Sequence, residues 1–475
     1  MRSRRSTSRR FSTSTATTSA EARAPLASPA TTFASSPNAT VYGVKPTVPT
    51  TKIELLRARP PIMEPMGGVA FLLIAAVAFG WPQPVAAETA TGQIAAPAPS
   101  WARSIEVVND GAPVMLGPHS ESRRRGTIGA GTRVGFTRRV FGEGCSTGVW
   151  YQTRDELFIC EANVTPSPAL PGPKMDEWAT NGARLPQRYA FIRFDGTRAY
   201  AHPSDYFRND YTEAFGKGFG IVVTGEQAYE GVEFIRTRRH LWVERGSVHF
   251  VHGSAFSGVK LGPGRPLNVA WVSPRPAKVH ERPQGRVIKR MDRHAVVRIE
   301  AIKGAWAKLS GGGWIKTTDL ARAEKTRPPE GVGPTDRWID INIERQVLVA
   351  YEGTTPMFAT LVSTGKNTKQ SETPFGIFQI WVKLAYTDMD DIERTDIPKN
   401  YSIQDVPWVQ FFKGSYGFHA AFWHNDFGRR RSHGCINLSP TDARYLFQFT
   451  QPILPPGWNA ILPIPQDHPT TVQVR

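Results

Sequence analysis

A short stretch near the carboxyl end of the chain collects the residue types that nucleophilic chemistry requires. Residues 418–438, which read FHAAFWHNDFGRRRSHGCINL, hold three of the eleven histidines and one of the three cysteines. A thiol with its ordinary pKa of about 8.5 is mostly protonated at neutral pH, so a catalytic cysteine needs an imidazole to receive its proton. Cys435 is the candidate nucleophile, and His419 and His433 are the candidate bases.

His419 is the better placed of these two bases. His433 lies only two residues before Cys435, so their backbone proximity restricts a useful approach, although both side chains would lie on one face of a strand. His419 lies sixteen residues before the cysteine and can approach the sulfur from a neighbouring strand. We therefore expect His419 to be the base.

The residues around Cys435 are suited to binding a carbonyl substrate. Gly434 has no side chain, which leaves room for the carbonyl to approach backbone N–H groups that form an oxyanion hole. The three arginines at 429–431 either form a solvated surface or raise the local positive potential, which would lower the thiol pKa and attract carboxylates. We expect substrate contacts from Ser432, His433, Asn437, Arg431, Trp423 and His424.

A metal site is the alternative use of the same side chains. Histidine and cysteine are both zinc ligands, and four of them lie close together here, at positions 419, 424, 433 and 435. No HExxH or CxxC spacing and no suitably spaced carboxylate accompanies them. We therefore expect no bound metal.

The pattern SHGCIN at 432–437, preceded by His419, resembles the signature of the L,D-transpeptidases, the YkuD-type cysteine enzymes of bacterial cell walls. Residues 363–365 (STG) and 373–376 (TPFG) resemble two further segments of that family. The resemblance covers residues 336–465 and implies a catalytic domain with a β-sandwich-like fold. The family often places an orienting side chain after the base histidine. Ala420 stands there, so only its backbone carbonyl could orient the imidazole.

The resemblance also implies a reaction. Cys435 would attack a tetrapeptide stem of peptidoglycan, releasing the terminal D-alanine, and an acceptor would then resolve the thioester. No metal or organic cofactor is needed. The acceptor stays open among a stem amine, water and an outer-membrane protein. Two other functions are a zinc-dependent murein endopeptidase and a wall-binding scaffold with an inactive catalytic domain.

Alternating apolar residues predict strands ahead of the site. Residues 339–343, 346–351 and 358–362 are expected to be strands, and 375–382 a central strand. The acidic stretch 384–410 lacks strong periodicity and is expected to be a lid or inserted loop. Downstream, Ser439 is expected to cap a helix that starts at Pro440 and runs to about Phe449.

The middle of the chain contains a divergent repeat. Three pairs of aromatic residues stand eight positions apart, with turn-forming or charged residues between the two members of each pair. They lie at positions 150 and 158, 234 and 242, and 306 and 314. Each pair predicts a β-hairpin. The arrangement resembles bacterial SH3-like domains, which implies small β-barrels at residues 101–165, 186–255 and 265–325. Such modules would bind wall peptides or glycan, or serve as spacers. The fold class is therefore mainly β.

The amino-terminal part of the chain predicts export. Residues 1–62 are rich in Ser, Thr, Arg and Pro and are expected to be disordered or to precede the true start codon. Residues 63–87 contain a fifteen-residue apolar run and end in the small residues VAA, which is typical of a signal peptide cleaved near Ala87. The alternative is a membrane anchor formed by the same segment. We expect a monomer in the periplasm or cell wall.

Cysteine usage and charge agree with export. Cys145 and Cys160 lie fifteen residues apart in one β-rich segment and could close a disulfide, which leaves Cys435 unpaired. Residues 88–475 carry an excess of ten basic over acidic residues, which suits an anionic wall or membrane surface or simply confers solubility. No concentrated basic stripe or known motif indicates nucleic-acid binding.

Overall fold

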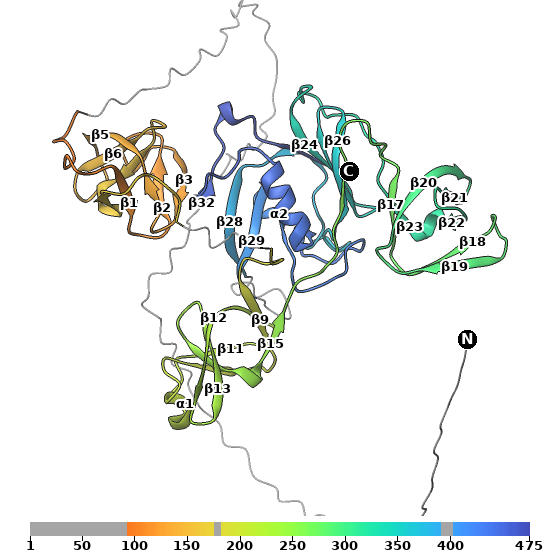
Figure 1. The fold of residues 1–475 in the computed structure, drawn as a ribbon, viewed down its shortest axis with the longest axis horizontal. Coiled ribbons are helices and arrows are strands. Elements are labelled where there is room, and N and C mark those ends of the chain that lie inside the picture. The colour runs from red at the N-terminus through yellow and green to blue at the C-terminus, as the bar shows by residue number, and fades with distance from the viewer. Residues whose placement is uncertain (1–92, 175–181, 391–401) are drawn as a thin grey trace, which may run out of the picture. The chain divides into compact units, whose positions relative to one another are not determined.

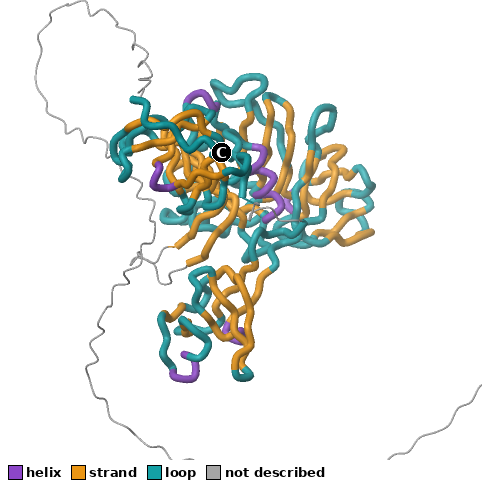
Figure 2. Tube along the Cα trace, turned by 60° about the vertical axis from the view of Figure 1, so that its left-hand side comes forward, coloured by secondary structure: helices purple, strands orange, loops and turns teal. Residues whose placement is uncertain are grey.

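The computed structural model describes residues 93–174, 182–390 and 402–475, all within one compact unit, Val85–Arg475. The predicted extension at 1–62 and the predicted signal peptide at 63–87 lie outside the described residues. Strands dominate the fold and helices are few, which confirms the mainly β class (Figure 2). Among the described residues, none of the helices has the length and apolar character needed to cross a membrane.

The first sheet of the carboxyl-terminal domain has six strands in the order β16-β26-β25-β24-β33-β27. Along β24, Ile339 and Ile341 point to one face and Trp338 to the other, as the period-two pattern requires. The last strand, β33, lies beyond the expected domain end at residue 465 and pairs in parallel with β24. The strands are β16 (Val259–Lys260), β24 (Arg337–Asn342), β25 (Val347–Glu352), β26 (Thr355–Leu361), β27 (Gly376–Gln379) and β33 (Thr471–Val474).

The second sheet carries the candidate site. Its strands pair in the order β31-β30-β29-β28-β32, and only the β30–β31 pair is parallel. The expected lid at 384–410 is wrong for the described residues, because β28 and β29 form a long antiparallel hairpin there. The strands are β28 (Val382–Asp390), β29 (Ser402–Lys413), β30 (Tyr416–Ala420), β31 (Ile436–Leu438) and β32 (Trp458–Ile461).

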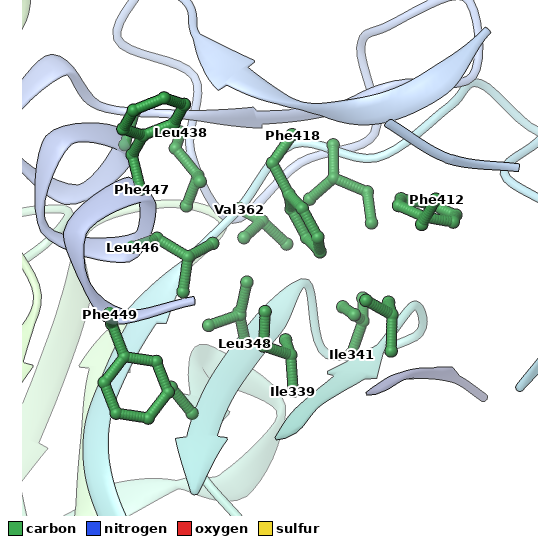
Figure 3. Packing of buried hydrophobic residues seen from close by; sticks show 14 of the residues in the cluster. Ile339, Ile341, Leu348, Val362, Phe412, Phe418, Leu438, Leu446, Phe447 and Phe449 are labelled. Carbon is green, nitrogen blue, oxygen red and sulfur yellow. The ribbon is translucent and has the colours of Figure 1, made fainter. Parts of the chain in front are cut away.

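Helix α2 (Pro440–Phe449) follows the second sheet directly and lies beside β28 and β29 in Figure 1. Ser439 caps it, since its Oγ accepts the Asp442 N–H at 3.2 Å, which confirms the predicted helix start. Leu446, Phe447 and Phe449 pack into one core with residues of both sheets (Figure 3). The two sheets and the helix therefore enclose a sandwich-like core, as expected for this domain.

Strand β27 differs from the expectation of a central strand. It pairs only with β33 and forms the edge of the first sheet. Phe375 and Ile377 are 63% and 58% exposed, so their apolar character does not reflect burial in the sheet.

Three β-rich segments precede this domain, and each has its own buried cluster. We call them the first (104–167), second (188–251) and third (269–322) segments. The predicted hairpins are confirmed in all three, as β6–β7, β13–β14 and β21–β22. A 3-10 turn and a further strand follow each hairpin, at η1 (Glu161–Asn163), η2 (Arg245–Ser247) and η3 (Thr317–Asp319). The SH3-like class and the exact module boundaries stay predictions.

The elements of the three segments have the following bounds. The first contains β1 (Ser104–Val107), β2 (Ala112–Met115), β3 (Arg124–Ile128), β4 (Arg133–Val134), β5 (Phe136–Phe141), β6 (Val149–Thr153), β7 (Phe158–Cys160) and β8 (Val164–Ser167). The second contains β9 (Arg188–Ile192), β10 (Thr197–Tyr200), α1 (Asp205–Arg208), β11 (Glu213–Phe215), β12 (Gly220–Tyr229), β13 (Val232–Thr237), β14 (Trp242–Glu244) and β15 (Val248–Val251). The third contains β17 (Val269–Val272), β18 (Ala277–His280), β19 (Val287–Met291), β20 (Val296–Lys303), β21 (Trp306–Leu309), β22 (Trp314–Lys316) and β23 (Leu320–Arg322), and a last turn, η4 (Pro465–Asp467), follows β32.

In the first segment, Cys145 and Cys160 form a disulfide, with their Cα atoms 5.5 Å apart. Cys160 is the last residue of β7, opposite Trp150 on β6, so the bond closes onto the hairpin. Cys435 is the free cysteine.

Candidate active site

The parallel pairing of β30 with β31 decides which side chains meet. Phe418 lies opposite Ile436 and His419 lies opposite Asn437. Phe418 and Ile436 both point into the sandwich core. Because side chains alternate along a strand, His419 and Asn437 share the opposite face, and Cys435 lies two residues before Asn437, just outside β31.

Cys435 sits immediately before β31, half-buried beside the turn that precedes β30. Its Sγ donates to the Ser415 carbonyl at 3.4 Å. Burial raises the pKa of the Cys435 thiol to about 11, and a hydrogen bond from the Gly417 backbone opposes that shift only in part. The resting thiol is therefore protonated at neutral pH and needs a base in order to react.

His419 provides a neutral imidazole. The side chain is 3% exposed, and burial lowers its pKa to about 4, while the hydrogen bond to Ala420 acts in the opposite direction. Nδ1 lies 3.3 Å from the Ala420 carbonyl, so Nδ1 carries the proton and Nε2 keeps its lone pair. Trp423 stacks on the ring with centroids 5.8 Å apart, which fixes the plane of the imidazole.

Position 434 requires a glycine, because the backbone conformation and the neighbouring ring leave no room for a side chain. Its φ is +127°, and a Cβ there would come within 2.4 Å of the Tyr416 ring. Its N–H donates to Ser432 Oγ at 3.0 Å, so in this state it is not available to a substrate oxyanion. Ser432 Oγ in turn donates to the Cys435 carbonyl. The buried Ser432 side chain therefore braces the loop around the cysteine, and its substrate contact stays a prediction.

Thr373 joins the STG and TPFG segments to the cysteine loop. Its Oγ1 accepts the Gly365 N–H at 2.9 Å and donates to the Gly434 carbonyl at 2.8 Å. Bridges between Gly365 and Ser432, and between Ser363 and Asn437, tie the same segments together. Three stretches that are far apart in sequence thus fix one loop.

His424 and Asn437 form a buried pair behind the site. His424 Nδ1 accepts the Asp426 N–H at 3.1 Å, and burial lowers the pKa of His424 to about 4. A neutral ring that accepts at Nδ1 carries its proton on Nε2, which lies 3.0 Å from the Asn437 amide. The amide oxygen therefore faces Nε2, and the NH₂ group takes the buried position where the amide has no partner. His424 acts here as a structural group.

The arginine run does not lower the thiol pKa, which corrects that expectation. Arg431 pairs with Asp426 at 2.7 Å, and Arg429 donates to the Pro274 carbonyl. The pKa of Cys435 is raised by burial, with none of these arginines among its causes. Arg431 and His433 are both exposed, so their substrate contacts stay predictions.

Metal binding has no preformed site in the described part of the chain. No group of three or more His, Cys, Asp or Glu side chains there is arranged to hold an ion.

Two contacts of the site were not anticipated from the sequence. The Ser415 carbonyl accepts a hydrogen bond from the Cys435 thiol, and the Tyr416 ring lies against Gly434. Ser415 lies in the turn between β29 and β30 and Tyr416 is the first residue of β30, so their role depends on the return of β30 beside β31. The signal for Tyr416 is its position three residues before His419, within the same short strand.

The arrangement suits acyl transfer through a cysteine. A neutral thiol just before β31 and a neutral imidazole on the paired strand β30 are suited to exchange a proton as sulfur attacks a carbonyl carbon. The Ala420 carbonyl and Trp423 hold the imidazole in one tautomer and orientation.

The sequence of this domain is similar to that of known proteins. Residues 336–472 match the YkuD family, described as the L,D-transpeptidase catalytic domain. YciB of Bacillus subtilis (strain 168), provisionally named an L,D-transpeptidase, is 25% identical over 152 residues, which cover 28% of this chain and 73% of that protein. Residues 336–472 therefore form a YkuD-family L,D-transpeptidase catalytic domain, the domain of an enzyme.

Solved structures of L,D-transpeptidases also resemble the chain. A cysteine-to-serine mutant of the Enterococcus faecium enzyme is 24% identical with a TM-score of 0.23, and the match covers 30% of this chain. The enzyme from Mycobacterium smegmatis is 19% identical with a TM-score of 0.24, covering 38% of this chain and 82% of that one. The match spans 50% of the Enterococcus chain.

Proposed function

We propose that the protein is a cysteine-dependent L,D-transpeptidase that acts on the tetrapeptide stems of peptidoglycan. One observation carries the proposal: His419, neutral and oriented by the Ala420 carbonyl, lies on β30 opposite Asn437 of β31, the strand that Cys435 immediately precedes. The family match of residues 336–472 supports the substrate class.

The reaction proceeds in two balanced steps. As Cys435 Sγ bonds to the carbonyl carbon of the stem, its proton passes to His419 Nε2. The carbon–nitrogen bond to the terminal D-alanine breaks, and the departing amine takes that proton. An acceptor amine then attacks the thioester and gives a proton to His419, which returns it to the sulfur. No cofactor enters either step.

The oxyanion of each tetrahedral intermediate needs backbone donors. Gly434 N–H lies in the loop beside Cys435 but is engaged by Ser432 Oγ in the resting state. The Gly434 N–H can therefore serve as an oxyanion donor only after its hydrogen bond to the Ser432 hydroxyl breaks.

Turnover of purified tetrapeptide stems with an amine acceptor tests the proposal. We expect D-alanine release that Cys435→Ala abolishes and that His419→Gln lowers by about 10²-fold or more, the usual contribution of a general base. His433→Gln, at the exposed alternative base, is the matched control and should cost less. Release that survives Cys435→Ala and stops with a chelator would support a zinc endopeptidase instead. Binding to sacculi without any release would support an inactive scaffold.

We propose further that the protein is exported, with residues 63–87 as a cleaved signal peptide. Free murein stems lie outside the cytoplasm, and the disulfide Cys145–Cys160 is compatible with an oxidising compartment. Amino-terminal sequencing of the processed protein should find a new terminus just after Ala87. Retention of this segment in a membrane fraction would indicate an anchor. An outer-membrane protein is one of the candidate acceptors. Analysis of the adducts formed on sacculi would identify the acceptor.

A further inference from the structure

The second segment contains a large open groove outside the catalytic site. Its volume is about 1390 Å³, and its walls come from residues 182–189, 222–224 and 250–252 together with Arg236, Arg238, His240 and Arg245. Five arginines and two histidines line it, and none of its described lining residues is an aspartate or glutamate. The groove is therefore open to solvent and lined by side chains of one charge sign.

Not all of these arginines are neutralised. Arg238 bonds to Asp405 Oδ2 at 2.5 Å, Arg188 pairs with Glu226, and Arg245 lies 3.9 Å from Glu226 and 3.7 Å from Glu233. Arg236 instead lies over the Trp242 ring at 5.9 Å, and Arg184 donates to the Gly253 carbonyl at 3.4 Å. Within the described residues, neither Arg184 nor Arg236 lies within salt-bridge distance of a carboxylate. Two guanidinium groups in the wall thus remain available to an anion.

An aromatic ring also fixes the position of Arg188 and Arg245, two arginines of the wall that pair with glutamates. Phe250 lies between Arg188 and Arg245, whose Cζ atoms stand 5.1 Å and 4.9 Å from its ring centroid. Cation–π contacts of this kind restrict the rotamers of both arginines before any ligand arrives. A planar guanidinium held in place matches a carboxylate in a bidentate manner at a lower entropic cost than a free lysine.

The groove is connected to the loop that follows the proposed base His419. Tyr189 in its wall packs against Phe422 with ring centroids 4.1 Å apart and the rings tilted by 30°, and Phe422 contacts Trp423, the residue that stacks on His419. Tyr189 also donates to the Asp405 carbonyl on β29 at 2.8 Å. A ligand in the groove would therefore lie on residues that pack directly against the catalytic domain.

We propose that this groove is a second binding site for the carboxylate-bearing peptide stems of peptidoglycan. The inference goes beyond the proposed function and rests on it for the identity of the polymer. A murein stem presents several free carboxylates on a short chain, which fits a groove of this size and charge. The groove holds a stem that does not react, and so keeps the polymer beside the catalytic domain.

Binding of a soluble disaccharide-tetrapeptide to the full chain, measured by calorimetry, tests the proposal. The double variant Arg184→Gln/Arg236→Gln should bind at least about tenfold more weakly, since it loses two charge-assisted contacts. Arg239→Gln is the matched control, because Arg239 lies in the same segment outside the groove and faces Glu213 at 3.4 Å. Its affinity should equal that of the wild type. Stems with amidated carboxylates should bind as weakly as the double variant does.

A second readout separates this site from the catalytic one. The double variant should release D-alanine from a small soluble donor peptide at the wild-type kcat, yet act more slowly on intact sacculi. Equal stem affinity in the wild type and the double variant overturns the groove assignment. Groove-dependent binding to anionic phospholipid vesicles, with none to stems, also overturns it in favour of a membrane. If the wild type binds stems through the groove but turns over no donor, the proposed function fails and the groove stands.

Discussion

The two reacting residues are each held in their neutral form by burial. Burial raises the pKa of Cys435 to about 11 and lowers that of His419 to about 4, so neither is ionised at neutral pH. A preformed thiolate–imidazolium pair is therefore not the resting state. The thiol is activated by His419 only as it attacks, which confines its reactivity to a substrate that positions a carbonyl.

These pKa values predict an almost flat pH profile. A His419 pKa lowered to about 4 keeps the base neutral at every pH above 4, and activity is lost as pH falls through that value. A Cys435 pKa raised to about 11 keeps the thiol protonated below that value. The second-order rate of acylation by a carbapenem should therefore change less than about twofold between pH 5.5 and 9. A limb with a midpoint between 6 and 8 would show a shifted histidine or thiolate instead.

The two residues proposed to react can be picked out from the sequence, but their protonation state cannot. The types and spacing of His419 and Cys435 are visible in the sequence, and so is the absence of a side-chain orienter at Ala420. The pKa of each depends on burial, which arises from strands far away in the chain. The expected effect of the arginine run failed for the same reason, because Arg431 meets Asp426 only once the loop is folded.

Among the elements, the end of helix α2 is held by a buried lysine. Lys383 on β28 is fully buried, and its Nζ donates to the carbonyls of Phe447, Thr450 and Pro452 at 2.7, 2.9 and 2.8 Å. Burial lowers the pKa of Lys383 to about 7, whereas the three carbonyls at the helix end favour the ammonium. The lysine thus joins the second sheet to the helix that packs behind β30 and β31.

Replacing this lysine should destabilise the domain strongly. Lys383→Met removes all three donors and leaves buried carbonyls without partners, at about 1–3 kcal/mol each. We expect the free energy of unfolding to fall by about 3 kcal/mol or more, measured by urea denaturation. Lys308→Met is the control, since Lys308 pairs with Glu300 on an exposed surface. A loss below 1 kcal/mol for Lys383→Met would mean that water or rearrangement satisfies the carbonyls.

Local sequence patterns predicted most elements well. The main error concerns strand β29, whose polar residues bond to groups far away in the sequence. The hairpins and the Ser439 cap follow from residues within ten positions. Strand β29 was missed because both of its faces are buried, which removes the period-two alternation. Its polar residues find partners far away in the chain: Asp405 pairs with Arg238, and Gln410 Oε1 accepts a hydrogen bond from Thr450.

At the scale of the whole described molecule, the amino-terminal segments support the loop that follows the catalytic base. The Phe427 carbonyl in that loop accepts hydrogen bonds from Arg293 and His294 of the third segment, both at 2.9 Å. A Cβ on Gly428 would come within 2.3 Å of Ser273 Oγ, so the loop and this segment fit closely. The loop that follows His419 is therefore held both by its own domain and by the third segment, which precedes that domain in the sequence.

Loosening this contact should slow the reaction. Arg293→Ala removes one bond to the Phe427 carbonyl and the 3.5 Å contact with Asp426, the partner of Arg431. We expect kcat for D-alanine release to fall about tenfold, or about 1.4 kcal/mol, through misplacement of the loop. Arg290→Ala, at an exposed position on β19, should leave kcat unchanged. Equal kcat in both variants would show that the loop holds its shape without the third segment.

The most direct test of the central claim is the intact mass of the purified protein after exposure to a carbapenem. The opened β-lactam ring stays on the sulfur, so the mass should rise by that of one whole drug molecule per chain. Cys435→Ala should show no adduct, and a chelator should change nothing. A folded, reduced protein that forms no adduct, or an adduct that persists in Cys435→Ala, would contradict the assignment of Cys435 as an activated nucleophile.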